Sequence, residues 1–333
     1  MSELRLNLVT REWVIIATER ARRPTDFSNP VMRPPLPEQL SSCPFCPGNE
    51  HRTPQEKTRL PDDGSWRVRV VENKYPALSG TEVKRSVEGM RRMVPGSGIH
   101  EVIIESRRHD VNTALMELAH LQDVIRVYRD RFLAAHNDPV VEHVIIFKNH
   151  GEGAGTSLEH THSQLIATPV VPVQFRERVY AAQQFFDSTG DCLICSILRQ
   201  ERDEGVRVIT DTEHFLTFVP YAALSPFHTW IFPKRHTAAF STITDDEIKD
   251  LSYHLKTFLS KCYYGLENPD YNYVIKSSRP QDAENEYCHW YLSVVPRITK
   301  AAGFELGSGM FINTSIPEKS AEFIRGVQTG PGA

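Results

Sequence analysis

Several features of membrane, secreted and nucleic-acid-binding proteins are missing from this chain. No apolar run in its 333 residues approaches the ~20 residues that a membrane-spanning helix requires. The amino-terminal segment Met1–Arg5 lacks the apolar core of a secretory signal. The formal net charge of -4 offers no basic surface for a nucleic-acid backbone. These absences predict a cytoplasmic protein whose partners include neither a membrane nor a nucleic acid.

Low-complexity tracts are also absent, and cysteine is scarce. A composition of 40% hydrophobic and 24% charged residues is typical of a soluble globular protein, and the length suffices for two domains. In a reducing compartment the six cysteines are expected to remain thiols. Four of them form two Cys-x-x-Cys pairs, Cys43/Cys46 and Cys192/Cys195. This spacing indicates a metal site or a redox pair, although two buried thiols would give the same pattern.

The segments that follow the two Cys-x-x-Cys pairs recur in the same order. After the first pair the sequence predicts two strands, over residues 68–78 and 100–109, then a helix over residues 115–132, and then two more strands, over residues 142–151 and 160–171. After the second pair the same series falls at residues 215–224, 228–236, 245–264 (the helix), 271–277 and 288–297. We therefore predict an α+β protein of two tandem units, each an antiparallel sheet with a packed helix, over residues 1–172 and 173–328.

The repeat also selects two matched sets of metal ligands. Each unit has a histidine after its second predicted strand and another at its last strand, at nearly equal separations in the two halves. Two thiolates and two imidazoles form a closed tetrahedral zinc site, which leaves no open position for a substrate. We expect two structural Zn²⁺ sites, with the ligands Cys43, Cys46, His109 and His160 in one half and Cys192, Cys195, His236 and His289 in the other.

The two halves differ in the run His160-Thr161-His162-Ser163-Gln164. On an extended segment His162 shares a face with His160, but the second half has Tyr291 at the position of His162 and Ser293 at that of Gln164. A neutral imidazole is a good nucleophile toward a phosphoric anhydride. We therefore predict one active site per chain, in the first half, with His162 as the nucleophile and the Gln164 amide as a donor to phosphate oxygens.

The Gly- and Ser-rich segment before His160 is the predicted phosphate loop. Its small residues would let backbone N–H groups approach a phosphate, and the hydroxyls of Thr156 and Ser157 could donate as well. A backbone carbonyl of residues 153–159 is expected to accept from the second nitrogen of His162 and so fix its tautomer. The cations Arg20, Arg22 and Arg23 either pair with the leaving half of the pyrophosphate or form an ordinary solvated basic patch.

Six motifs in order carry a resemblance to a known family. They are RARRP (20–24), CPFC (43–46), ENKYPAL (72–78), HEVIIES (100–106), FKNHG (147–151) and GTSLEHTHSQ (155–164). Along nearly its whole length the chain resembles galactose-1-phosphate uridylyltransferases, a branch of the histidine-triad superfamily. The resemblance implies two fused histidine-triad units, usually paired as a homodimer. It also implies a double displacement in which a nucleoside-diphosphate sugar passes its nucleotidyl group to a histidine and then to a second acceptor.

The site residues of the family can be assigned to this chain by their positions in these motifs. The resemblance implies that His162 is the covalent nucleophile and Gln164 its phosphate contact, and that the two Cys/His sets are zinc ligands. It further implies a group of substrate-binding residues, Arg20, Arg23, Asn73, Asn149, Gly155, Thr156 and Ser157, with Gly303, Phe304 and Glu305 at the sugar.

Departures from the bacterial members of the family bear on the substrate. Thr161 stands where those members have proline, and Cys192 and Cys195 belong to a second metal site that uses a glutamate and histidines there. The segment 302–309 also differs from the corresponding segment of those bacterial members. These features look more like the plant-type branch, an ADP-glucose phosphorylase that passes an adenylyl group to phosphate. We predict UDP-glucose:hexose-1-phosphate uridylyltransferase activity in galactose metabolism. The alternatives are ADP-glucose phosphorylase, or a nucleotide-sugar hydrolase or binding protein.

Overall fold

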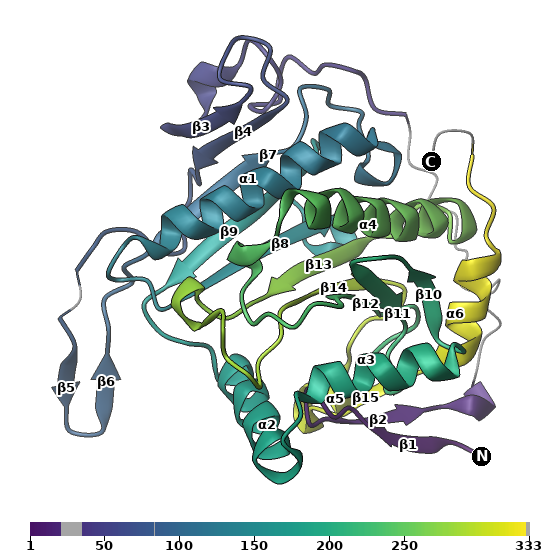
Figure 1. The fold of residues 1–333 in the computed structure, drawn as a ribbon. Helices are drawn as coiled ribbons and strands as arrows, with labels where there is room; N and C mark the ends of the chain where they lie inside the picture. The colour runs from purple at the N-terminus through teal and green to yellow at the C-terminus, as the bar shows by residue number, and fades with distance from the viewer. Residues whose placement is uncertain (21–34, 83, 331–333) are drawn as a thin grey trace.

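A single ten-stranded antiparallel sheet forms the centre of the molecule (Figure 1). The computed structural model describes residues 1–20, 35–82 and 84–330. The strand order across the sheet is β10-β11-β12-β14-β13-β8-β9-β7-β4-β3. Its amino-terminal strands are β3 (Glu56–Leu60), β4 (Val68–Glu72), β7 (Ile99–Ile104), β8 (His143–His150) and β9 (His162–Thr168). Its carboxy-terminal strands are β10 (Val208–Asp211), β11 (Phe215–Phe218), β12 (Thr229–Pro233), β13 (Tyr271–Lys276) and β14 (Tyr291–Pro296).

The sheet consists of two halves with the same internal order. Each half contributes five strands, and the halves meet where β8 pairs with β13, with Ile146 opposite Ile275. The α+β class and the antiparallel pairing are confirmed, but the two predicted sheets are the two halves of one continuous sheet. Two predicted strands end early, β4 at Glu72 and β11 at Phe218.

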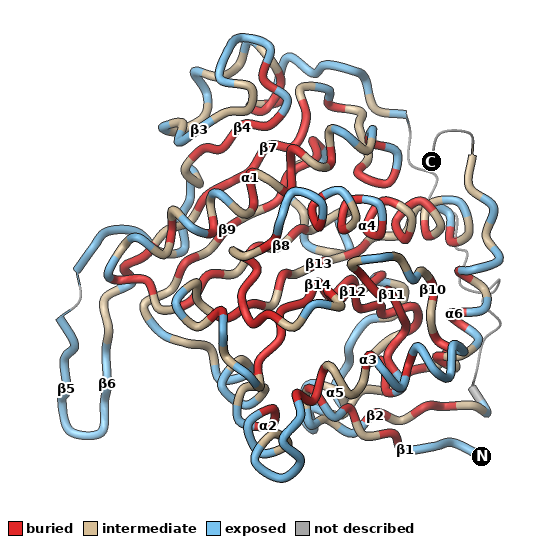
Figure 2. Tube along the Cα trace, in the orientation of Figure 1, coloured by how far each residue is buried: buried red, intermediate tan, exposed pale blue. Residues whose placement is uncertain are grey.

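Two long helices cover one face of the sheet. They are α1 (Leu118–His136) and α4 (Asp245–Gly265), one from each half, and they pack against each other (Figure 1). The hydroxyl of Thr244 accepts from the Glu247 N–H, and the Glu247 carboxylate accepts in return from the Thr244 N–H, so a capping box begins the second helix. The largest core cluster lies beneath these helices, and Figure 2 shows the buried residues along the central strands.

The opposite face of the sheet carries the chemistry-bearing residues. Along β4 and β7, Val70 and Ile103 belong to the core under the helices, whereas Val71 and Val102 pack with Cys43 on the other side. This alternation follows from the two-residue period of a strand. In the carboxy-terminal half, α3 (Leu193–Glu204) covers the corresponding face, and α2 (Val173–Thr189) connects the halves.

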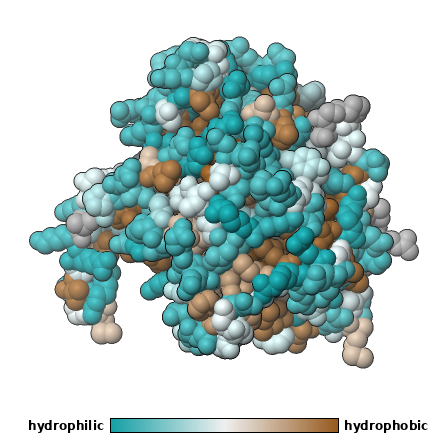
Figure 3. Space-filling view, viewed as in Figure 1, coloured by the Kyte–Doolittle hydropathy of each residue, from teal (hydrophilic) through white to brown (hydrophobic). Residues whose placement is uncertain are grey.

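Smaller elements complete the fold. A three-stranded sheet forms from β1 (Glu3–Leu6), β2 (Trp13–Ile16) and β15 (Phe311–Asn313), and a projecting hairpin from β5 (Ser86–Glu88) and β6 (Arg91–Met93). The last helices are α5 (Gly303–Ser308) and α6 (Pro317–Gly326). Among the described helices, none combines the length and apolar content needed to cross a membrane. The face in Figure 3 is mainly hydrophilic, with apolar side chains gathered near its lower edge.

Candidate active site and metal centres

The first predicted ligand set lies together on the sheet face opposite α1. The Sγ atoms of Cys43 and Cys46 are each 3.6 Å from Nδ1 of His160, and Cys46 Sγ is 3.6 Å from Nδ1 of His109. Sulfur and nitrogen ligands bound at about 2.3 and about 2.0 Å to one tetrahedral ion would lie about 3.6 Å apart. All four residues are buried, so the cluster has the donor set and spacing of a closed four-coordinate site.

The ring of His160 is oriented by its second nitrogen. Nε2 donates to the carbonyl oxygen of Ser106 at 2.7 Å, which leaves Nδ1 unprotonated and directed at the thiols. Burial lowers the pKa of His160 to about 4, so the ring is neutral near pH 7, the form that binds a metal. Nε2 of His109 is buried without a hydrogen-bond partner among the described residues.

The second set lies together in the same way in the other half. Cys195 Sγ is 3.4 Å from Nδ1 of His236 and 3.7 Å from Nδ1 of His289, and Cys192 completes the cluster. His236 Nε2 donates to the Asn285 carbonyl at 3.0 Å, and His289 Nε2 donates to the Pro233 carbonyl at 2.9 Å. Both predicted ligand sets therefore form clusters that could hold a metal ion.

His162 begins β9 immediately beyond the first Cys/His cluster. Its Nδ1 donates to the backbone carbonyl of His160 at 2.8 Å, so the lone pair of the neutral ring is on Nε2. Burial lowers the pKa of His162, which favours this neutral form. The predicted acceptor in residues 153–159 is wrong. Carbonyls of that loop have other donors, since Ala154 O accepts from Asn272 and Leu158 O accepts from the Thr156 hydroxyl.

A buried ion pair supports the backbone around His162. The Lys148 ammonium, 1% exposed, pairs with the fully buried Glu105 carboxylate. It also donates to the Thr161 hydroxyl at 2.8 Å and to the His162 carbonyl at 3.1 Å. Thr161 donates to Glu105 at 2.9 Å, a bond that a proline at this position could not make. Tyr128 donates to Glu105 at 2.6 Å and completes the network.

Electrostatics keep the Glu105 carboxylate ionised. Burial alone would raise its pKa, but the charge and hydrogen bonds of Lys148 outweigh that effect and lower the pKa from 4.5 to about 2. Because the folded-state pKa is the lower one, the stabilisation is complete above about pH 4.5 and is lost as the pH falls toward 2.

A cavity of about 790 Å³ has His162 in its wall. Of the predicted site residues, Asn73, Ser157, His162 and Gln164 line it. Basic side chains that the sequence analysis did not assign line it as well: His51, Arg52 and Lys74. The arrangement places a neutral imidazole beside amide and hydroxyl donors and cationic groups, which suits a phosphorylated ligand.

Other predicted residues do not line this cavity. The Asn149 amide oxygen accepts from Asn272 at 2.8 Å, and Gly155 ends a 3-10 turn at φ 86° beside it. The Thr156 hydroxyl faces the Leu158 carbonyl. The Gly153 N–H of the predicted phosphate loop donates to Asp270 at 2.5 Å, because the loop packs against the start of β13.

The predicted sugar contacts and arginines lie elsewhere. Gly303, Phe304 and Glu305 are in α5, which Figure 1 shows beside β15 and well apart from β9. The Glu305 carboxylate accepts from the Ala302 N–H at 2.9 Å and so caps its own helix. Arg22 and Arg23, and the side chain of Arg20, lie outside the part of the chain that the structure describes.

Sequence reasoning missed His100. Its Nε2 lies 2.8 Å from Oε1 of Gln164. The internal repeat contained the signal, because His100 begins the motif HEVII and His228 begins the corresponding HTWIF.

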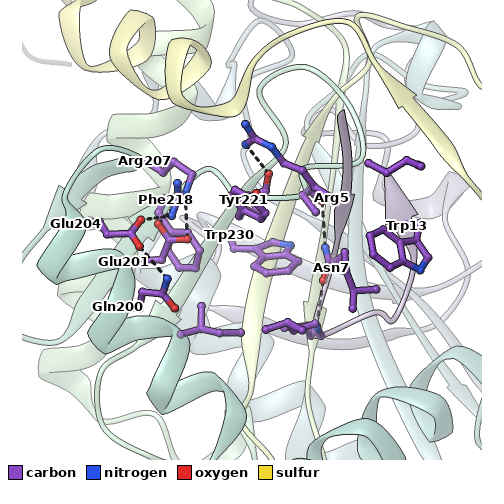
Figure 4. A pocket seen from close by; sticks show the side chains of 17 residues that line it. Arg5, Asn7, Trp13, Gln200, Glu201, Glu204, Arg207, Phe218, Tyr221 and Trp230 are labelled. Carbon is purple, nitrogen blue, oxygen red and sulfur yellow. Dashed lines mark hydrogen bonds and ion pairs between the residues drawn. The ribbon is translucent and has the colours of Figure 1, made fainter. Parts of the chain in front are cut away.

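The corresponding face of the second half is filled by aromatic rings. Tyr291, the counterpart of His162, stacks on Phe232 with ring centroids 4.6 Å apart. A cavity of about 590 Å³ lies nearby, with Phe218 and Trp230 on its wall (Figure 4). Its arginines are paired, as Arg207 with Glu201 at 3.0 Å, so this cavity has neither a histidine nucleophile nor an uncommitted arginine in its lining.

Comparison with known proteins matches both halves to one family. Residues 1–172 match the family model described as galactose-1-phosphate uridyl transferase, N-terminal domain, and residues 174–310 match its C-terminal domain. The ADP-glucose phosphorylase of Arabidopsis thaliana is 38% identical over 98% of this chain and 93% of its own length. The galactose-1-phosphate uridylyltransferase of Thermotoga maritima is 28% identical over 98% of each chain.

Solved structures agree with these matches. A crystal structure of the Arabidopsis thaliana ADP-glucose phosphorylase with bound ADP-glucose has a TM-score of 0.83 at 34% identity, covering 98% of this chain and 99% of that one. A structure of a uridylyltransferase has a TM-score of 0.76 at 25% identity and covers 98% of each chain.

The buried ion pair provides a stability test. Lys148→Met leaves the Glu105 carboxylate buried without its cation, so we expect the free energy of unfolding in urea to fall by about 3–5 kcal/mol. The double variant K148M/E105L, which removes both charges, should recover part of that loss. Lys319→Met breaks the exposed pair with Glu322, with both side chains more than 60% exposed, and should cost under about 1 kcal/mol. Equal losses in the two single variants would contradict this role for Lys148.

Proposed function

The chain belongs to the galactose-1-phosphate uridylyltransferase family, and on that premise we propose that it transfers a nucleotidyl group from a nucleoside-diphosphate sugar through a covalent intermediate on His162. The observation that carries the proposal is the geometry of this ring. Its Nδ1–H is bound to the His160 carbonyl, so Nε2 has the free lone pair at the wall of the cavity. A nucleophile held in one tautomer needs no rearrangement before it attacks.

The first half-reaction exchanges one bond for another. Nε2 of His162 attacks the α-phosphorus of the donor, and an N–P bond forms as the bond to the β-phosphate oxygen breaks. The electron pair of that bond leaves with the sugar 1-phosphate. In the second half-reaction an acceptor phosphate oxygen attacks the same phosphorus, and the electron pair of the N–P bond returns to Nε2. The Nδ1–H bond to a carbonyl stabilises the positive charge on the ring during both steps.

Polar groups around His162 would bind the phosphates. Gln164, Asn73 and Ser157 line the cavity, and we assign them to the phosphate oxygens of the donor. From their positions in the family motifs, and not from the cavity lining, we assign a second group of residues to the nucleotide: Arg20, Arg23, Asn149, Gly155 and Thr156. Gly303, Phe304 and Glu305 could reach the cavity only from a second copy of the chain, which the predicted homodimer would supply.

We assign ADP-glucose as the donor and inorganic phosphate as the acceptor. The assignment rests on the greater identity to the ADP-glucose phosphorylase, 38% against 28% for the Thermotoga maritima uridylyltransferase over the same share of this chain. The expected UDP-glucose and galactose 1-phosphate pair is the second candidate, because the matching family models describe uridyl transferases.

Both Cys/His clusters fit Zn²⁺. Their two sulfur and two nitrogen donors lie at tetrahedral spacing, and four protein ligands leave no open coordination position. Bound zinc would supply structural stability and hold His160 in place. The residues of the chain alone carry out the transfer.

The wider assignments follow the family. We infer that residues 1–172 form the catalytic domain and residues 173–328 the second domain, each a histidine-triad-like unit. We also infer that the protein acts as a homodimer in the cytoplasm.

The nucleophile can be tested by deleting its side chain. His162→Gly should form no acid-labile nucleotidyl adduct and lose turnover, because no other imidazole lies at that wall position. Added imidazole should restore part of the transfer. His120→Ala, which removes an imidazole from α1 outside the cavity lining, should retain both adduct and turnover. A His162→Gly protein as active as the parent without imidazole would refute the assignment.

The donor and acceptor can be tested by labelling and chase. The protein is incubated separately with ADP-glucose and UDP-glucose, each labelled in its nucleotidyl group, and the adduct is then chased with phosphate or galactose 1-phosphate. We expect faster labelling by ADP-glucose and release of ADP by phosphate. Preferential labelling by UDP-glucose, with discharge to galactose 1-phosphate, would support the second candidate instead. Rapid discharge to water would indicate a hydrolase, and no adduct would indicate a binding protein.

Metal analysis tests the two clusters. Protein purified without chelators should contain close to two equivalents of zinc per chain. Removal of the metal should lower the thermal unfolding temperature, because ligand binding to the native state is coupled to folding. Cys288→Ser, which alters a buried cysteine outside both clusters, should leave the zinc content unchanged. Less than one equivalent in active protein would exclude at least one site.

A further inference from the structure

The orientation of the Gln164 amide decides what it can do at a phosphate. Its NH₂ end donates hydrogen bonds, whereas its oxygen only accepts them. Both ends have the same shape, so only the neighbouring hydrogen bonds can select which one faces the cavity. The first such neighbour is His100 on β7, adjacent to β9 in the sheet.

The backbone fixes the tautomer of His100. The Ala77 N–H donates to Nδ1 of the ring at 3.0 Å, so Nδ1 must carry a lone pair. The proton of the neutral ring is therefore on Nε2, 2.8 Å from Oε1 of Gln164. A proton on Nδ1 would direct two donors, the ring N–H and the Ala77 N–H, at each other. His100 thus donates to the oxygen end of the Gln164 amide.

Asn73 supports the same orientation. The Tyr75 N–H donates to its Oδ1 at 2.8 Å, so its Nδ2 faces the His100–Gln164 pair, 3.4 Å from Oε1 of Gln164 and 3.1 Å from Nε2 of His100. With the proton of His100 on Nε2, both nitrogens are donors that converge on the Gln164 oxygen. The oxygen of Gln164 therefore faces two donors, and no described residue accepts from its Nε2. Since Gln164 and Asn73 both line the 790 Å³ cavity, the free NH₂ group is available to a ligand there.

The second half of the chain contains the same series of contacts, which we call the histidine relay: a backbone N–H donates to Nδ1 of a histidine, and Nε2 of that ring contacts a side chain on the adjacent strand. The Leu224 N–H donates to Nδ1 of His228 at 3.4 Å, and Nε2 of that ring lies 2.9 Å from the Ser293 hydroxyl. The sheet register is equivalent, because Val102 lies opposite Gln164 and Trp230, two residues beyond His228, lies opposite Ser293. The relay thus belongs to the repeated unit, and only in the first half does it end at an amide beside a histidine nucleophile.

We propose that His100 is a positioning residue that holds the Gln164 amide with its NH₂ group toward the reacting phosphate. The inference rests on the proposed function, in which Gln164 contacts the phosphate attacked by His162. Negative charge on the non-bridging oxygens would be stabilised by a donor and repelled by the amide oxygen. A relay already in place in the free protein means that the donor need not reorient during the reaction.

The test compares His100→Leu and His100→Gln by the rate of adduct formation with labelled ADP-glucose, and with labelled UDP-glucose in parallel. His100→Leu removes the donor, so the maximal rate should fall about 10- to 100-fold while the KM for the donor stays within about threefold. His100→Gln places an amide N–H near the former Nε2 and should restore most of the rate. Thermal melts of both variants verify folding.

A double variant separates positioning from general damage. Because His100 acts through Gln164, H100L/Q164A should be no slower than Q164A alone. His228→Leu makes the same change at the twin relay and should leave the rate unchanged, even where it lowers stability. A multiplicative loss in the double variant, a parent-like rate in His100→Leu or a comparable loss in His228→Leu would overturn the proposal.

One further measurement does not depend on activity. Nitrogen NMR of ¹⁵N-histidine-labelled protein, with His100→Gln to assign the resonance, should show the proton of His100 on Nε2. A proton on Nδ1 would overturn the relay whatever the activity. A parent protein that forms no adduct with either nucleotide sugar would overturn the proposed function, and the role of His100 would fall with it. A parent adduct with an unaffected His100→Leu rate would overturn only the positioning role.

Discussion

The double use of His160 is the constraint on which the candidate site depends. Its ring belongs to the buried Cys/His cluster, while its backbone carbonyl accepts the Nδ1–H of His162. The residue that joins the structural cluster therefore also sets the tautomer of the proposed nucleophile. A shift of His160 would change both, so the cluster is coupled to the orientation of the His162 ring through the backbone.

The sheet converts this local arrangement into a rigid site. His162 and Gln164 lie on β9, between β8 and β7, and each neighbour contributes a supporting side chain, Lys148 behind and His100 beside. Strand pairing fixes these positions relative to one another, because the register of an antiparallel ladder determines which side chains are opposite. The buried charges of Lys148 and Glu105 are tolerated because they are paired and hydrogen-bonded.

The repeat explains why the molecule has two similar halves and one candidate active site. Both halves contain a Cys/His cluster and a histidine that contacts the last strand of its half. In the second half Tyr291 stacks on Phe232, and aromatic packing occupies the face that the cavity uses in the first.

The sequence alone determined the α+β class, the members of both Cys/His clusters and the difference between His162 and Tyr291, because these follow from spacing and from comparison of one half with the other. Only the tertiary structure decided the joining of the halves at β8 and β13, the carbonyl that orients His162 and the contact between His100 and Gln164. It also separated α5 from the cavity. These features depend on contacts between segments distant in the chain, for which strand register and hydrogen-bond direction, rather than residue type, determine the outcome.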